Sequence, residues 1–206
     1  MKTHVKKLRN VLLCFPFVYG TLWGQGFDIS PESGLITTEF GVSDTVLIKL
    51  TSQPSSDVTI GVSLSDTTEG SIASVELIFS STNWDTYQPL LLTGVNDDLQ
   101  DGDIQYTLIL ASAVSNDAGY SGLDPTDISA TNFDDDRVAV EIYPTNGVIV
   151  TEKGDAAIIS VRLDSKPQSD VFIGFATSDE TEGVVSTSPL TFTSDNWSDI
   201  QQVTVE

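Results

Sequence analysis

The sequence predicts an all-β protein, built from immunoglobulin-like antiparallel β-sandwiches that form tandem repeats of 113 residues. Two observations predict this fold: short apolar runs that alternate with polar residues, and a long internal repeat. Gly, Pro, Asn, Asp and Ser separate the runs, and no segment has the periodicity of a helix longer than a turn. A period of two is typical of half-buried strands, and roughly seven such strands suit an immunoglobulin-like sandwich.

The first repeat contains seven predicted strands, at 27–38 with a bend at Pro31, 45–51, 57–64, 76–79, 88–94, 104–112 and 126–132. The second is representative, because Val46, Ile48 and Leu50 share one face while Lys49 points the other way. Between the third and fourth strands, the run "TTEGSIAS" is expected to form a turn in which Gly70 adopts a positive φ.

Self-comparison shows that the chain repeats itself without gaps. "PESGLITTEFG" at 31–41 recurs as "PTNGVIVTEKG" at 144–154, and "DVTIGVSLSDTTEG" at 57–70 recurs as "DVFIGFATSDETEG" at 170–183. Of 64 aligned positions, 25 are identical. We therefore expect one complete repeat at 27–136 and a second, truncated repeat at 137–206, and we expect the parent protein to be longer, because a partial sandwich leaves strand edges unpaired.

Residues 1–26 are predicted to be a secretory signal peptide. A basic start, "MKTHVKKLR", precedes the apolar run "VLLCFPFVYGTLW" and the small residues "GQG", with cleavage expected after Gly26. The apolar run is short for a bilayer span, although an uncleaved anchor is the alternative. The expected location is therefore extracellular or at the cell surface, without membrane insertion after cleavage.

The charge of the remaining chain is strongly negative. All 30 acidic residues follow position 26, where five of the nine basic residues remain, so this region carries a formal charge of −25. Such a chain repels nucleic acid and anionic membranes. The only histidine and cysteine, His4 and Cys14, lie in the leader, which excludes disulfides, the usual zinc sites and His-based catalytic triads from the rest. We expect no enzyme activity.

The acidic residues are predicted to gather at one end of the sandwich. If consecutive strands run in opposite directions, alternate connections emerge at the same end, together with the tail that follows the last strand. That end then holds eleven carboxylates: Glu39, Asp44, Asp66, Glu69, Asp97, Asp98, Asp101, Asp103, Asp134, Asp135 and Asp136. The opposite end holds only Asp57, Asp85, Asp117 and Asp124.

A divalent cation would relieve the repulsion between these carboxylates. Calcium accepts six to eight oxygen ligands in irregular geometry, which loops supply readily. A helix-loop-helix calcium motif is excluded, because "DDLQDG" has Leu99 at its third position and lies between strands. A solvated acidic surface that binds no ion is the alternative.

The run "GVNDDLQDGDIQYTLIL" after "LIFSSTNWDTYQPLLL", with "TEFG" before it and "NFDDD" after it, resembles the Calx-beta module, which occurs in tandem in large bacterial surface and adhesin-like proteins. The resemblance covers nearly all of 27–206. It implies that the calcium ligands are Glu39, Asp66, Asp97, Asp98, Asp101, Asp134, Asp135 and Asp136, with Glu69 and Asp103 as further candidates. The second repeat matches only three of these, with Glu152, Asp179 and Glu182, and is expected to bind calcium poorly or not at all.

The sequence thus favours a non-catalytic, calcium-binding extracellular repeat protein that serves as a stalk or adhesive surface module. Calcium would stiffen the joint between repeats, and the expected partners are neighbouring repeats and a cell-surface or glycan ligand. The alternative is an accessory, carbohydrate-binding module of a larger secreted enzyme. Trp84 and Trp197 recur at one place in the two repeats, which favours packed residues, whereas exposure of Trp84 beside Tyr87 would favour a sugar site. A hydrolase with paired carboxylates would need a concave cleft.

Overall fold

The computed structural model describes residues 24–186 and 188–206, so nearly all of the predicted signal peptide lies outside the described part. That part is all-β; it contains no helix, and hence none with the length and apolarity needed to cross a bilayer. The strands up to residue 133 are β1 (Phe27–Ser30), β2 (Leu35–Thr38), β3 (Ser43–Leu50), β4 (Val58–Leu64), β5 (Gly70–Ile72), β6 (Glu76–Phe79), β7 (Gln88–Gly94), β8 (Ile104–Leu110), β9 (Val114–Ser115) and β10 (Ile128–Phe133). The strands that follow are β11 (Val140–Tyr143), β12 (Ala157–Leu163), β13 (Val171–Ile173), β14 (Leu190–Phe192) and β15 (Gln201–Val205).

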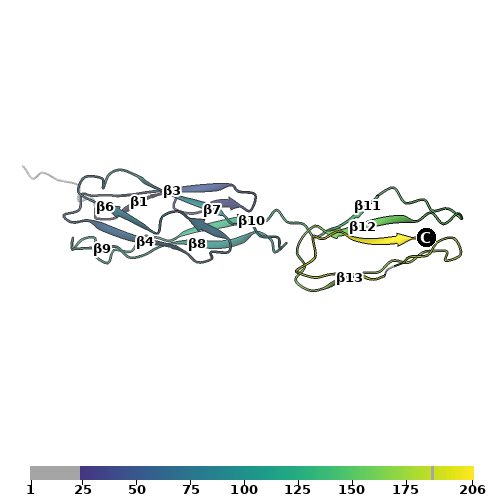
Figure 1. Cartoon of the computed structure of the whole chain (residues 1–206). Coiled ribbons are helices and arrows are strands. Elements are labelled where there is room, and N and C mark those ends of the chain that lie inside the picture. Colours follow the sequence, from purple (N-terminus) through teal and green to yellow (C-terminus); the bar gives the residue numbers. More distant parts are fainter. Residues whose placement is uncertain (1–23, 187) are drawn as a thin grey trace, which may run out of the picture.

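The first unit is an immunoglobulin-like sandwich of two sheets (Figure 1). One sheet has the order β1-β3-β7-β5 and the other β2-β10-β8-β4-β6, with β9 paired to β4. The predicted first strand is divided at Pro31, where the chain leaves one sheet and joins the other. All pairs are antiparallel except β2 with β10, which run parallel, so these two strands end at the same pole.

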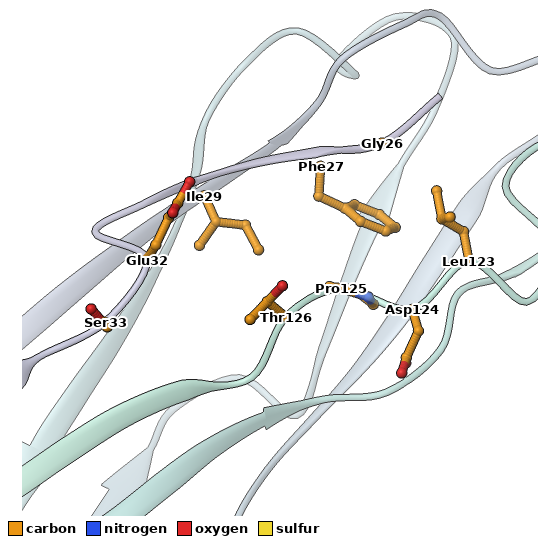
Figure 2. Close-up of a pocket in the computed structure, with 9 residues that line it drawn as sticks. All are labelled: Gly26, Phe27, Ile29, Glu32, Ser33, Leu123, Asp124, Pro125 and Thr126. Carbon is orange, nitrogen blue, oxygen red and sulfur yellow. The ribbon is translucent and has the colours of Figure 1, made fainter. Parts of the chain in front are cut away.

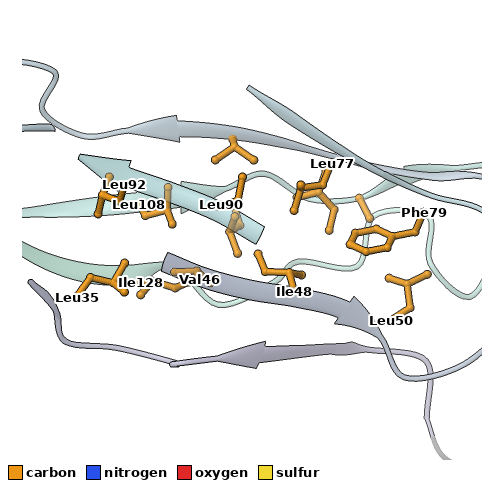
Figure 3. Close-up of a cluster of buried hydrophobic side chains, with 14 of the residues drawn as sticks. Leu35, Val46, Ile48, Leu50, Leu77, Phe79, Leu90, Leu92, Leu108 and Ile128 are labelled. Atoms are coloured by element: carbon orange, nitrogen blue, oxygen red, sulfur yellow. The ribbon is translucent and has the colours of Figure 1, made fainter. Parts of the chain in front are cut away.

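Alternate residues of each strand fill the space between the two sheets. Val46 and Ile48 from β3 meet Phe79 from β6, Leu90 from β7 and Ile128 from β10, and all five are fully buried (Figure 3). Because the side-chain period of a strand is two, the residues between them, such as Leu47 and Lys49 of β3, face outwards. This core fixes which residues point towards the loops at each pole.

The strand pairs after residue 137 have the registers of the first unit, 113 positions further along. Val46 faces Leu90 across β3 and β7, and Ile159 faces Val203 across β12 and β15. The pairs β1 with β3 and β11 with β12 agree in the same way, as do β4 with β6 and β13 with β14. The domain boundaries at 136 and 137 stay a prediction.

The segment 67–74, predicted as a turn, is a turn only at 67–69 and then continues as a strand. Gly70 to Ile72 form β5, which pairs with β7, and Gly70 does not have a positive φ. A Cβ atom at Gly70 would lie 2.5 Å from the ring of Tyr106, so a larger residue does not fit. Glycine is needed here for close packing rather than for a turn conformation.

Candidate metal centre

Four segments bring acidic residues to the pole where β2 and β10 end. Glu39 directly follows β2, and Glu69 directly precedes β5. The connection between β7 and β8 carries Asp97 to Asp103, and the tail after β10 carries Asp134 to Asp136. In Figure 1 this pole is the end of the first unit that faces the second. The four segments are far apart in sequence and adjacent in the fold.

Glu39, Asp97 and Asp136 form the centre of this cluster. Each offers one carboxylate oxygen, and the three oxygens lie within 4.8 Å of one another. The Oε2 atom of Glu39 and the Oδ2 atom of Asp136 are buried and have no hydrogen-bond partner. A buried charged oxygen without a hydrogen-bond partner is costly, so this triad has the donor set and the burial expected of a cation site.

The raised pKa values of carboxyl groups in this cluster also fit a cation site. Burial raises the pKa of Glu39 to about 7, together with the charges of Asp97, Asp134 and Asp136. The pKa of Asp136 is also raised, by burial first and then by nearby aspartates. A cation between these groups would remove the repulsion and favour their ionised forms.

Glu69 and Asp101 extend the cluster on a second side. Glu69 is buried, and its pKa is raised by burial and by the charges of Asp101, Asp66 and Asp97. The pKa of Asp101 is raised by burial, by Asp97 and by Asp134. Asp97 and Asp134 therefore interact with both sides, and the carboxylates form one continuous patch of negative charge.

Three other predicted ligands, Asp66, Asp103 and Asp134, accept hydrogen bonds from loop residues with a carboxylate oxygen. Asp134 Oδ2 accepts the backbone N–H of Gly102 at 2.7 Å, and Asp103 Oδ1 accepts the backbone N–H of Asp134 at 3.3 Å. Asp66 Oδ1 accepts both the N–H and the hydroxyl of Thr68, at 2.9 and 2.6 Å, which lowers its pKa. The Oδ1 atom of Asp134 also accepts the backbone N–H of Asp136 at 2.7 Å, so both of its oxygens brace loops, whereas Asp66 keeps its Oδ2 atom for a cation.

Asp98 and Asp135 are exposed at the margin of the cluster. Their charges raise the pKa of Asp136, and the backbone N–H of Asp135 bonds to Glu39 and lowers the pKa of that residue. The backbone oxygen of Asp98 accepts the N–H of Lys166 at 2.7 Å. The ten predicted ligands thus occupy one pole, in graded degrees of burial.

Asp44 lies at the start of β3 at the same pole, but backbone donors hold both of its carboxylate oxygens. Its Oδ2 atom accepts the N–H of Ile36 at 3.0 Å, and its Oδ1 atom accepts the N–H of Thr45 at 2.7 Å. Asp44 is therefore engaged with backbone donors beside β2 and β3.

The second unit lacks such a centre within its described residues. Glu152, Asp179 and Glu182 are exposed, and Asp179 bonds to Thr181 as Asp66 bonds to Thr68. No described segment of that unit corresponds to the tail after β10. The expectation of weak calcium binding there stays a prediction.

The structure does not form a sugar platform at Trp84. That side chain is partly buried and packs against the core, as Trp197 does in the second unit. The backbone oxygen of Trp84 accepts the N–H of Leu50, and that of Trp197 accepts the N–H of Leu163. Both tryptophans are parts of the framework.

One cleft of the first unit lies away from the acidic centre. A cleft of about 390 Å³ lies between β1 and the segment that precedes β10 (Figure 2). Phe27 and Ile29 line it, with Glu32 near one end and Asp124 near the other. None of the ten predicted ligands lines this cleft.

No protein-family model and no curated protein matches this sequence. Among solved structures, the chain is similar to the calcium binding domain CBD12 of CALX1.1, with a TM-score of 0.43 and 15% identity over 86% of this chain and 74% of that one. It is also similar to the apo-form Calx CBD1 domain, with a TM-score of 0.37 and 15% identity over 53% and 96%. A third similar structure is WR4, an MSP family member of C. elegans, with a TM-score of 0.34 and 13% identity over 52% and 95%. The likeness concerns the fold alone.

Proposed function

We propose that this protein is a non-catalytic, calcium-binding β-sandwich protein whose cation site is the pole formed by Glu39, Asp97 and Asp136. The observation that carries the proposal is the pair of buried carboxylate oxygens without partners, on Glu39 and Asp136. Solvated acidic surfaces leave their oxygens in water, where they need no further partner.

The donor set selects calcium among the common ions. Every candidate ligand is an oxygen, which excludes the soft and borderline metals that prefer thiolate or imidazole. The ligands come from loops rather than from a rigid octahedral cage, and calcium tolerates the irregular geometry that results better than magnesium does.

The position of the site supports a role at the joint between units. Asp136 is followed directly by Arg137, whose Nε atom donates to Asp164 Oδ2 of the second unit at 3.0 Å. The loop that carries Asp97 reaches the same unit through the bond from Lys166 to Asp98. A bound cation would fix the tail and this loop together and so reduce bending at the joint.

A stiff joint suits an exported stalk or adhesive surface protein, outside the cell or on its surface, in contact with neighbouring repeats. The packed state of Trp84 removes the observation that would have favoured a sugar-binding accessory module. A cell-surface or glycan ligand would then have to bind elsewhere on the chain.

Thermal unfolding with calcium and with chelator tests the proposal. With a dissociation constant near ~0.1 mM, about 10 mM calcium adds roughly 2.7 kcal/mol to the free energy of unfolding of the first unit. The corresponding rise in the unfolding midpoint is about 10 °C or more. Magnesium at the same concentration is the control and should give a smaller rise.

The matched variant replaces Asp134, Asp135 and Asp136 together by Asn. It keeps the shape of the tail and removes three charges, so the response to calcium should disappear. An equal midpoint in calcium and in chelator for the unmodified protein would contradict the proposed function.

A further inference from the structure

Asn132 is a buried polar residue in the core-facing row of β10. Ile128 and Ala130 precede it in this row at alternate positions, and Asn132 is 1% exposed. A buried amide must find partners for two N–H donors and one oxygen, or it destabilises the fold. Its partners therefore show what this position is for.

The amide of Asn132 bonds to three other chain segments. Its Oδ1 atom accepts the hydroxyl of Thr37 on β2 at 2.9 Å. Its Nδ2 atom donates to the backbone oxygen of Val95 at 3.0 Å and to Oε2 of Glu69 at 3.3 Å. One side chain thus connects β10, β2, the end of β7 and the start of β5.

These segments are the ones that carry the acidic centre. Thr37 lies two residues before Glu39, Val95 two residues before Asp97, and Asn132 itself two residues before Asp134. Each of these acids thus lies just past the end of a strand, two residues from Asn132 or from a group bonded to it, so the Asn132 bonds fix the points from which the acidic segments start. Glu69 is held directly.

The surrounding packing shows that the segments approach Asn132 closely. A Cβ atom at Gly94 would lie 2.4 Å from the Oδ1 atom of Asn132, so only glycine fits there. Gly94 pairs with Gly70 across β7 and β5, and Gly70 packs on the ring of Tyr106. The hydroxyl of Tyr106 lies 3.1 Å from that of Thr37 and completes a buried polar network.

We propose that Asn132 is the positioning residue of the cation site: it holds the four acidic segments in binding geometry before the ion arrives. Without a cation the carboxylates repel one another, and a neutral amide beneath them counters that repulsion without adding charge. Pre-arranged ligands bind an ion more tightly, because less order has to be gained on binding. This inference rests on the proposed calcium function.

The test compares calcium affinity with stability in two variants of the protein. Asn132→Leu keeps a similar volume and removes all three bonds, and its dissociation constant for calcium, measured by isothermal titration calorimetry, should rise at least about tenfold, as for other residues that orient metal ligands. Ser55→Ala at the opposite pole removes a hydrogen bond to Asp117, and it should lower the unfolding midpoint in chelator while leaving the calcium affinity unchanged.

The outcomes separate the two proposals. If the unmodified protein binds calcium and Asn132→Leu binds it with the same affinity, Asn132 is merely structural and the positioning proposal is overturned. If the unmodified protein binds no calcium, the proposed function fails and the positioning role falls with it. Should Asn132→Leu not fold, Thr37→Val removes the hydroxyl bond to Asn132, together with the hydroxyl's contacts to Tyr106 and Thr131, and keeps the two bonds that Asn132 donates. A weaker affinity supports the proposal, and an unchanged one overturns it.

Discussion

Two buried carboxylates, one at each pole of the first unit, have opposite properties. Glu39 and Asp117 are each 7% exposed. The pKa of Glu39 is raised to about 7, whereas that of Asp117 is lowered to about 2. Two carboxylates with the same exposed fraction can therefore differ in whether the fold favours their ionised form.

The difference lies in what surrounds the oxygens. Asp117 accepts the N–H and the hydroxyl of Ser55 at 2.7 and 2.9 Å, the N–H of Gly119 at 2.9 Å and the amide of Gln25 at 3.2 Å. Glu39 faces other carboxylates and has an oxygen without a partner. The four donors in place make Asp117 a structural residue, whereas Glu39 has a donor in the backbone N–H of Asp135 but none at its Oε2 atom, which is available to a cation.

The largest expected effect comes from Glu39→Gln, which keeps the shape of the side chain and removes its charge. Calcium affinity should fall at least about tenfold, because ligand charge sets the affinity of such sites. In chelator at pH 8 the same variant should be more stable by about 1 kcal/mol, since it removes a repelled charge that water only partly screens. Calcium titration and chemical unfolding measure the two changes, and a loss of stability in chelator would contradict this account of the pole.

At the opposite pole, removal of a carboxylate should lower the stability of the fold and leave its response to calcium unchanged. Asp117→Asn removes the charge and keeps only one acceptor oxygen, so either the bonds from Ser55 or those from Gly119 and Gln25 are lost. The unfolding midpoint should therefore fall by several degrees, equally in calcium and in chelator. Thermal unfolding under both conditions measures this. A fall in chelator alone would mean that the two poles are coupled and do not contribute independently to stability.

The pH dependence of stability tests whether the charge of Asp117 stabilises the fold. The pKa of Asp117 is about 2 in the fold, against 3.8 for a free aspartate, so its ionised form stabilises the fold. That stabilisation is fully present above about pH 4 and is lost as the pH falls through 2. The difference in unfolding midpoint between the unmodified protein and Asp117→Asn, both in chelator, should therefore shrink between pH 4 and pH 2. A constant difference would show that the bonds of Asp117 do not depend on its charge.

Much of the fold follows from local pattern. The strands predicted at 76–79 and 88–94 have the bounds of β6 and β7, because their alternation is regular and turn residues flank them. β5 was missed, since Gly70 suggested a turn and the ring of Tyr106 that requires a glycine lies far along the sequence. The parallel pairing of β2 with β10 likewise depends on a contact between distant strands.

The pole of the site could be predicted, but its inner arrangement could not. Alternating strand directions place the acidic segments together, and that needs only the order of the strands. Which carboxylates are buried, as Glu39 is, depends on loop geometry. Asn132 left one signal: in "ISATNF" it is a polar residue at a position where the alternation expects an apolar one. A polar residue on the inner face of a strand beside an acidic tail indicates a support for that tail.

The smallest expected effect concerns Asp44, which lies at the acidic pole but is not one of the ten predicted ligands. Its two oxygens accept the N–H groups of Ile36 and Thr45. Asp44→Asn keeps one acceptor oxygen, so stability should fall by no more than about 1 kcal/mol. Calcium affinity should stay within about twofold of the unmodified value, because a charge outside the cluster acts on the ion only through water and salt. Calorimetric titration checks this, with Glu39→Gln as the contrasting variant. If both variants weakened calcium equally, net negative charge rather than the buried triad would determine binding, and the distinction between the cluster and its surroundings would fail.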